Sequence, residues 1–228
     1  FPFTMKKLLF FLNLLVFYSG YSQNLVPNHS FEQYVACPAS AGELPEPGLP
    51  SISVVDWYKA TYGTSDYFND CSTSPTVSVP QNFFGWQYPR TGRAYAGEYL
   101  ANIGSGQREY IQSRLSIPLI AGHQYYVSFW VNLADNSPFA LHQIGAYLGS
   151  AYVYDASAWQ LDNLLPQVVN QPGNFITDTA KWRLVHGAFT ASGGEQYIVI
   201  GNFASAANLE TLPSNSSGLC YYYVDDVC

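Results

Sequence analysis

The chain has 228 residues, of which 48% are hydrophobic, 17% aromatic and only 11% charged. Sixteen acidic residues outnumber nine lysines and arginines, so the formal net charge is −7, which excludes a basic nucleic-acid-binding surface and disfavours anionic membranes as partners. The length suits one large β-domain with its own core, and the low charged fraction is typical of an extracellular protein.

The first recognisable segment is an export signal. A methionine and two lysines precede an apolar run, which is the layout of a secretory signal peptide over residues 5–22. Residues 1–4 precede the initiator as upstream sequence, and cleavage is expected before Gln23 or one residue later. A membrane anchor is disfavoured because the run is short and contains Asn13. We expect a single β-sandwich domain over 23–228, secreted or on the outer cell surface, with no membrane insertion and a net charge of −9 once the two lysines are removed.

The first third of the mature chain alternates short strands with long loops. Residues 24–34 predict a short strand, a Pro-Asn turn and the start of a second strand. A strand at 52–58 lies between two segments rich in Pro, Gly and Ser, at 37–50 and 61–80, which we predict as loops. Residues 81–88 are aromatic without a clear period.

From residue 92 onward the pattern is regularly β. Alternating, β-branched and aromatic segments predict strands at 93–100, 108–115, 124–133, 140–148, 182–190, 195–203 and 220–228. The strands at 182–190 and 195–203 are expected to pair with each other through residues 191–194, and 158–169 predicts a short helix or a surface turn. Many short strands without βαβ alternation predict an all-β antiparallel sandwich.

Four cysteines in an exported chain predict disulfides. Cys37 and Cys71 flank one loop-rich region and form the preferred pair. Cys220 and Cys228 stand at opposite ends of one predicted strand, about 26 Å apart, which is too far for a bond between them. Cys228 either pairs with a group outside this chain or stays free, and the sequence leaves both alternatives open.

The closing strand ends in two adjacent carboxylates, Asp225 and Asp226. Neighbouring strand residues point to opposite faces, so both cannot face solvent if one face is core. An inward carboxylate is costly unless it is hydrogen-bonded, paired with a cation or bound to a metal.

Several motifs resemble known families. The segments 24–32, 118–129 and 223–227 resemble jelly-roll carbohydrate-binding modules with a galactose-binding-domain-like fold. The segments 66–69, 90–97 and 194–203 are more similar to a group of surface proteins from gliding-type Gram-negative bacteria, in which such a module often precedes an OmpA-type peptidoglycan-binding domain or a secretion-sorting domain.

The resemblance implies a structural calcium ion. In the related modules a glutamate of the first motif and an aspartate of the last share the ion, which makes Glu32 and Asp225 the candidate ligands here, completed by main-chain carbonyls. The alternative is that backbone N–H groups or an arginine satisfy both carboxylates. The family usually has glycine at the position of His29, so the resemblance does not determine the local turn geometry here.

A glycan or cell-surface polysaccharide is the expected partner. Sugar sites combine aromatic platforms with planar polar groups, and eight residues in or beside the predicted loops supply these types: Trp57, Tyr62, Tyr67, Phe68, Trp86, Tyr88, Arg90 and Arg93. The alternative is that most of these rings belong to the core, since the chain is so rich in aromatics.

Catalytic motifs are missing from the sequence. There is no nucleophile elbow, phosphate-binding loop or metal-type histidine spacing, so we expect no enzyme. A glycosidase pair among Asp56, Asp66, Asp135 and Glu98 is a third hypothesis. The leading hypothesis is a secreted, calcium-stabilised, non-catalytic carbohydrate-binding or adhesive module, and the second is a structural spacer that presents a downstream domain and has no ligand.

Overall fold

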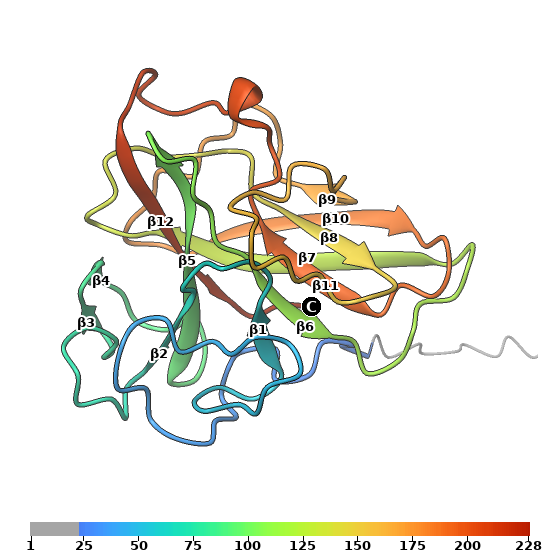
Figure 1. Ribbon diagram of the computed structural model, residues 1–228, viewed down its shortest axis with the longest axis horizontal. Helices are drawn as coiled ribbons and strands as arrows, with labels where there is room; N and C mark the ends of the chain where they lie inside the picture. The colour runs from blue at the N-terminus through green and yellow to red at the C-terminus, as the bar shows by residue number, and fades with distance from the viewer. Residues whose placement is uncertain (1–22) are drawn as a thin grey trace, which may run out of the picture.

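The computed structural model describes residues 23–228, so the predicted signal peptide lies outside the described residues. Two five-stranded antiparallel sheets pack face to face as a sandwich (Figure 1). The first sheet runs in the order β1 (Trp57–Lys59), β6 (Ile111–Arg114), β11 (Tyr197–Gly201), β8 (Gly145–Gly149) and β9 (Val168–Val169). The second runs in the order β10 (Arg183–Thr190), β7 (Gln124–Leu133), β12 (Gly218–Asp225), β5 (Ala94–Ile103) and β2 (Asp66–Asn69). The predicted all-β antiparallel jelly-roll sandwich is confirmed.

Alternation along β5 divides the interior into two layers. Ala96 and Leu100 face the space between the sheets and join the main core, whereas Tyr95 faces outward. The outward side is not solvated there, because a second aromatic core lies on it under residues 70–88. This core contains Phe68, Val77, Phe84, Tyr95, Ala134, Tyr221 and Tyr223. The short hairpin of β3 (Gln81–Asn82) and β4 (Gly85–Trp86) belongs to this covering segment.

The predicted pairing of 182–190 with 195–203 is wrong. β10 pairs with β7, and β11 pairs with β6 and β8, so residues 191–194 cross from one sheet to the other. Backbone hydrogen bonds explain the crossing: the N–H of Ala191 donates to His123 and the N–H of Gly194 donates to Leu119. The two ends of this loop are therefore bound to the segment before β7 rather than to each other.

Other predicted elements are shorter than expected. Residues 24–34 contain no strand, only an isolated bridge between Tyr34 and Val54. Residues 158–169 form turns and β9 instead of a helix, and the one helical turn is the 3-10 segment η1 (Ala206–Asn208) among the described residues. None of the helical structure in 23–228 is long and apolar enough to cross a membrane.

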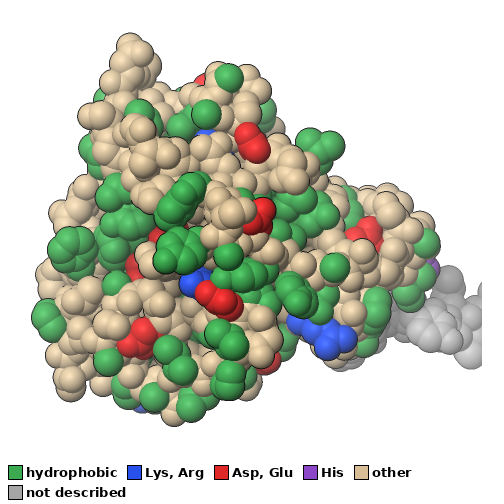
Figure 2. Space-filling view, in the orientation of Figure 1, with side chains coloured by type: hydrophobic (Ala, Val, Ile, Leu, Met, Phe, Trp, Pro, Cys, Tyr) green, Lys and Arg blue, Asp and Glu red, His purple; other side chains and the backbone are tan. Residues whose placement is uncertain are grey.

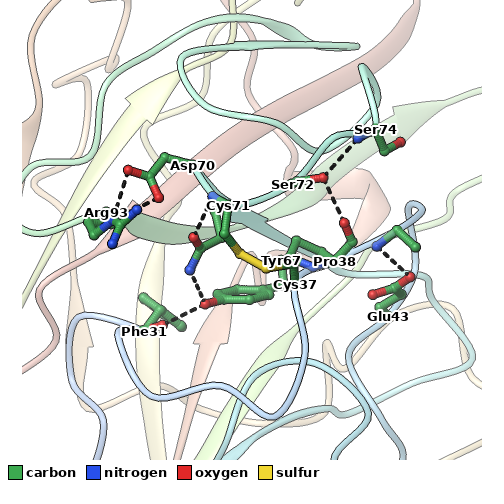
Figure 3. The surroundings of a disulfide bond; sticks show 12 residues. Phe31, Cys37, Pro38, Glu43, Tyr67, Asp70, Cys71, Ser72, Ser74 and Arg93 are labelled. Atoms are coloured by element: carbon green, nitrogen blue, oxygen red, sulfur yellow. Dashed lines mark hydrogen bonds and ion pairs between the residues drawn. A yellow bond between two sulfur atoms is a disulfide. The ribbon is translucent and has the colours of Figure 1, made fainter.

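A disulfide joins Cys37 and Cys71, as the sequence predicts, with their Cα atoms 5.7 Å apart (Figure 3). Hydrogen bonds fix the chain on both sides: Ser72 Oγ donates to the Pro38 carbonyl at 2.7 Å, and Asn69 Nδ2 donates to the Tyr67 hydroxyl at 2.7 Å. The bond ties the loop after residue 37 to the end of β2. Cys220 is a buried thiol and Cys228 an exposed one.

Candidate functional site

Glu32 and Asp225 both bind the turn that precedes β5. Oε1 of Glu32 accepts the N–H groups of Arg93 at 2.8 Å and Ala94 at 3.1 Å. The turn lies so close that a Cβ at Gly92 would collide with this oxygen, and Gly92 has φ of +66°, which also favours glycine. The first and last motifs of the chain therefore meet at one turn.

Asp225 is the buried member of this pair. Its Oδ2 accepts the N–H of Arg90 at 2.8 Å and of Thr91 at 3.3 Å, and its Oδ1 accepts the N–H of Asp226 at 2.7 Å. Burial, followed by the neighbouring charge of Asp226, raises the pKa of Asp225 to about 8. These backbone bonds are the alternative to calcium that the sequence left open.

The carboxylates of Glu32 and Asp225 are the type of ligand that calcium binds, but they are only two. Carboxylate oxygens are the right ligands, and the ion takes about six to eight of them, so main-chain carbonyls would have to supply most of the shell. No cluster of three or more Asp, Glu, His or Cys suited to a metal occurs within 23–228. Calcium at Glu32 and Asp225 stays a prediction.

Both predicted arginines are engaged within the chain. The guanidinium of Arg90 lies 3.9 Å from the centre of the Trp130 ring and pairs with Asp226. The side chain of Arg93 is 65% exposed and its Nε donates to both carboxylate oxygens of Asp70 at 2.8 Å. Arg90 thus fixes the end of β12, and Arg93 is the more accessible of the two.

Three of the predicted ligand-binding rings are in the core, so their assignment to a surface platform is wrong. Trp57 is fully buried and donates Nε1–H to the Asn28 carbonyl at 2.9 Å. Tyr67 and Phe68 are also fully buried, and Phe68 stacks on Tyr95 with ring centroids 5.0 Å apart. The segments that carry these rings pack into the sandwich, and local composition does not reveal this.

Trp86 and Tyr88 are exposed, at 52% and 61%. Their rings meet edge to face at 6.1 Å. Their backbones are well fixed: the N–H of Trp86 donates to Asp135 Oδ2, and Trp182 Nε1 donates to the Tyr88 carbonyl. They form an accessible aromatic pair beside the small hairpin.

Tyr62 lies at a pocket of about 220 Å³ together with Trp159, a ring that the sequence patterns did not single out. Their rings meet edge to face at 5.7 Å, with 57% of Tyr62 and 39% of Trp159 exposed. The loops that carry them are joined where Thr61 and Asp155 form a bridge. The Trp159 carbonyl also accepts the N–H of Arg108 at 3.0 Å. Hydrogen bonds therefore position both aromatic walls.

Polar groups complete the pocket. Asn102 Nδ2 donates to Gln107 Oε1 at 3.2 Å, and within the described part of the chain Asn102 Oδ1 and Gln107 Nε2 have no partner. One amide acceptor and one amide donor are therefore available to a ligand. Leu219 and the half-buried Tyr99 contribute the remaining apolar surface.

Glu109 holds two walls of the pocket together. It accepts the N–H and the hydroxyl of Thr64 at 2.7 and 2.8 Å through Oε1, and the N–H of Tyr99 at 2.8 Å through Oε2. A Cβ at Gly63 would be 2.7 Å from Glu109, so this close approach requires glycine. Burial raises the pKa of Glu109. Its hydrogen bonds indicate a positioning role.

The four acids considered for glycosidase chemistry do not meet across a pocket. Asp66 is buried and accepts the Tyr221 hydroxyl at 2.5 Å. Glu98 is fully buried, and neither of its oxygens has a hydrogen-bond partner in the described chain. Asp135 binds the hairpin backbone, and none of the four lines the Tyr62–Trp159 pocket.

No protein-family model matches the chain, and no curated protein does. Solved structures are similar in fold. A Stig cyclase from Fischerella sp. TAU, in complex with an indole compound, has a TM-score of 0.50 and 12% identity over 89% of this chain and 93% of that one.

Two further structures are more distant. The CBM22-1 xylan-binding domain of Paenibacillus barcinonensis Xyn10C has a TM-score of 0.43 and 11% identity over 87% of this chain and 88% of its own. The K1 cleaved adhesin domain of Lys-gingipain from Porphyromonas gingivalis W83 has a TM-score of 0.37 and 16% identity over 82% and 94%. At 12% identity the similarity to the cyclase concerns the fold alone, and no conclusion about this chain is drawn from the two more distant structures.

The sequence offered one local signal for Trp159. Trp159 lies in a polar stretch, Ser157-Ala158-Trp159-Gln160. A large aromatic residue in a segment expected at the surface is unusual unless it contacts something. It lies nearly a hundred residues from Tyr62, so their proximity follows only from the fold. Asn102 and Gln107 carried no signal, because exposed amides are common.

Proposed function

We propose that this chain is an exported, non-catalytic module that binds glycan at the Tyr62–Trp159 pocket. The observation that carries the proposal is the pocket itself, in which two partly exposed rings lie beside an unpartnered amide acceptor and donor. Pyranose rings stack on aromatic faces, and their hydroxyls need planar polar partners. The disulfide supports an oxidising, extracellular setting.

The proposal includes the cellular setting. The signal peptide over 5–22 would export the chain, and the module would act on the cell surface, as in the proteins of gliding-type bacteria that its motifs resemble. A downstream domain of the same polypeptide would anchor it. A cell-surface polysaccharide is the partner.

A glycan array tests the binding. We expect the wild type to bind, and Tyr62→Ala and Trp159→Ala to lose most of the signal because each removes a stacking wall. Tyr126→Ala is the matched control, since Tyr126 is 55% exposed, close to the exposure of Tyr62, and does not line the pocket.

The array also separates the alternatives. Loss of binding in Trp86→Ala and Tyr88→Ala but not in the pocket variants would move the site to the hairpin. If the wild type binds no glycan, with or without calcium, the proposal fails and a structural spacer is the better description.

Calcium is the second part of the proposal. An ion held by Glu32 and Asp225 would join the first and last motifs and neutralise the buried carboxylate. We expect added calcium to raise the melting temperature, by an amount equivalent to about 2.7 kcal/mol at a hundredfold excess over the Kd.

Asp225→Asn should lose this response, whereas Asp226→Asn should keep it. Differential scanning fluorimetry with and without EDTA measures both. A wild-type transition that does not move with calcium would refute the site.

A further inference from the structure

A second pocket adjoins the Tyr62–Trp159 pocket. It has a volume of about 270 Å³ and is lined by Phe83, Phe84, Tyr99, Ala134, Asn136, Ser137, Leu219 and Tyr221. Tyr99 and Leu219 line both pockets, so the two are neighbours across one shared wall. These two residues lie on β5 and β12, which are adjacent strands of the second sheet (Figure 1).

The size of each pocket limits what it can hold. Pockets for drug-sized ligands measure about 300–1,000 Å³. Each of the two pockets falls below this range, so each suits one ring-sized group, whereas their combined volume falls within it.

Phe83 gives the second pocket its own platform. It is 67% exposed, and its ring contacts Phe84 edge to face at 5.3 Å. Phe84 in turn stacks on Tyr221 with centroids 3.6 Å apart. Asn136 Nδ2 donates to the Phe83 carbonyl at 3.0 Å, which leaves Asn136 Oδ1 as an available acceptor. The exposed ring therefore rests on a fixed aromatic base.

The charged side chains at the two pockets are engaged within the chain. Lys59 Nζ lies 5.8 Å from the centre of the Tyr62 ring and pairs with Glu46 Oε1 at 3.4 Å. Arg108 is buried and donates to the carbonyls of Asn202 and Ala204, and Glu109 is occupied by its three hydrogen bonds. On the face drawn in Figure 2, hydrophobic side chains form several patches and charged side chains are few. Because the cationic side chains at the pockets are already paired within the chain, the pockets favour neutral sugars over uronic or sulfated ones.

From these observations we infer that the ligand spans both pockets and is a neutral glycan chain of at least two rings. One ring stacks on the exposed aromatic surface of the Tyr62–Trp159 pair and another on Phe83, with Tyr99 and Leu219 beneath the linkage. The inference rests on the proposed function and specifies its ligand class.

Isothermal titration with neutral oligosaccharide ladders tests it, using glucose, xylose and mannose series of one to four rings. In the series that binds, affinity should rise about tenfold when the chain becomes long enough to reach the second platform, as expected for one more stacked ring. Phe83→Ala should abolish this gain. Trp159→Ala should weaken ligands of every length, and Tyr126→Ala should behave as wild type.

The outcomes separate the inference from the proposed function. Equal affinity for one ring and for longer chains, or wild-type behaviour of Phe83→Ala, would overturn the two-pocket inference while glycan binding stands. Binding of charged glycans alone on the array would overturn the neutral class. If neither the ladders nor the array show binding, the proposed function itself fails.

Discussion

The turn at residues 90–94 shows how single residues close the fold. Glu32 and Asp225 come from opposite ends of the described chain, and each accepts two backbone N–H groups of this turn. A carboxylate that accepts several N–H groups is stabilised in its charged form, which offsets part of the cost of burial. The absence of a side chain at Gly92 lets the turn approach Glu32.

Gly92→Ala should therefore lower the free energy of unfolding by more than backbone strain alone would. Gly173 is the matched control, because its φ of +75° is similar to the +66° of Gly92, while a Cβ at Gly173 would have no neighbouring atom within 4 Å. Strain should cost each variant about 1–2 kcal/mol of unfolding free energy, and the contact with Glu32 should cost Gly92→Ala about a further 1–3 kcal/mol. Urea denaturation measures the difference, and equal losses would show that the turn can move away from Glu32.

At the scale of elements, the loops of the first third are held by a few cross-links. The disulfide binds residue 37 to the end of β2, and Glu109 binds the loop at 61–64 to β5. Regular strand pairing is sparse in this region, since β1 has only three residues and β2 only four. The disulfide and the Glu109 hydrogen bonds therefore hold these loops in place, as backbone hydrogen bonds between paired strands do in the second sheet.

Removing the disulfide should lower stability substantially. The bond closes a sequence separation of 34 residues, for which a loss of about 2–4 kcal/mol is typical. We expect this loss in the Cys37→Ser, Cys71→Ser double variant, measured by urea denaturation under non-reducing conditions. Cys228→Ser removes an exposed free thiol and should leave the midpoint unchanged. A double variant as stable as wild type would contradict the structural role of the bond.

At the scale of the whole molecule, buried carboxyl groups set the dependence of stability on pH. Burial raises the pKa of Asp66 and Glu98, with the charge of Glu109 as the next cause for each, and it raises the pKa of Asp225 to about 8. The folded state holds these protons more tightly than the unfolded chain, where Asp and Glu titrate near pH 4. Their stabilising contribution is therefore complete below about pH 4 and is lost as the pH rises through the folded values.

We expect the urea midpoint to fall between pH 5 and pH 9. Glu98→Gln removes one of the titrating groups and should flatten this fall, whatever its effect on stability at pH 5. Asp155→Asn is the control, because Asp155 is exposed and its pKa is lowered by its bonds to Ser157, so it is ionised throughout this range. An equal slope in Glu98→Gln and wild type would show that Glu98 does not titrate there.

Calcium bound at Asp225 would oppose the fall of stability with pH, so the stabilising effect of calcium should be larger at pH 9 than at pH 5.

The sequence by itself determined the class of fold. Period-two alternation and β-branched or aromatic residues are local properties, and they placed the strand at 124–133 at its observed bounds and that at 182–190 within one residue. The preference for pairing Cys37 with Cys71 also came from the sequence, because these two cysteines flank one loop-rich region, and the disulfide confirms it. Pairing between strands did not follow, since the crossing at 191–194 depends on bonds to the distant segment before β7.

Only the tertiary structure decided which aromatic rings reach the surface. Trp57 and Tyr62 come from neighbouring segments of similar composition, yet one is fully buried and the other 57% exposed. Burial depends on which distant segment packs against a ring, and no local pattern carries that information. The same reason explains why Trp159 and Phe83 enter the candidate site: the fold brings them to Tyr99 and Leu219, which both pockets share.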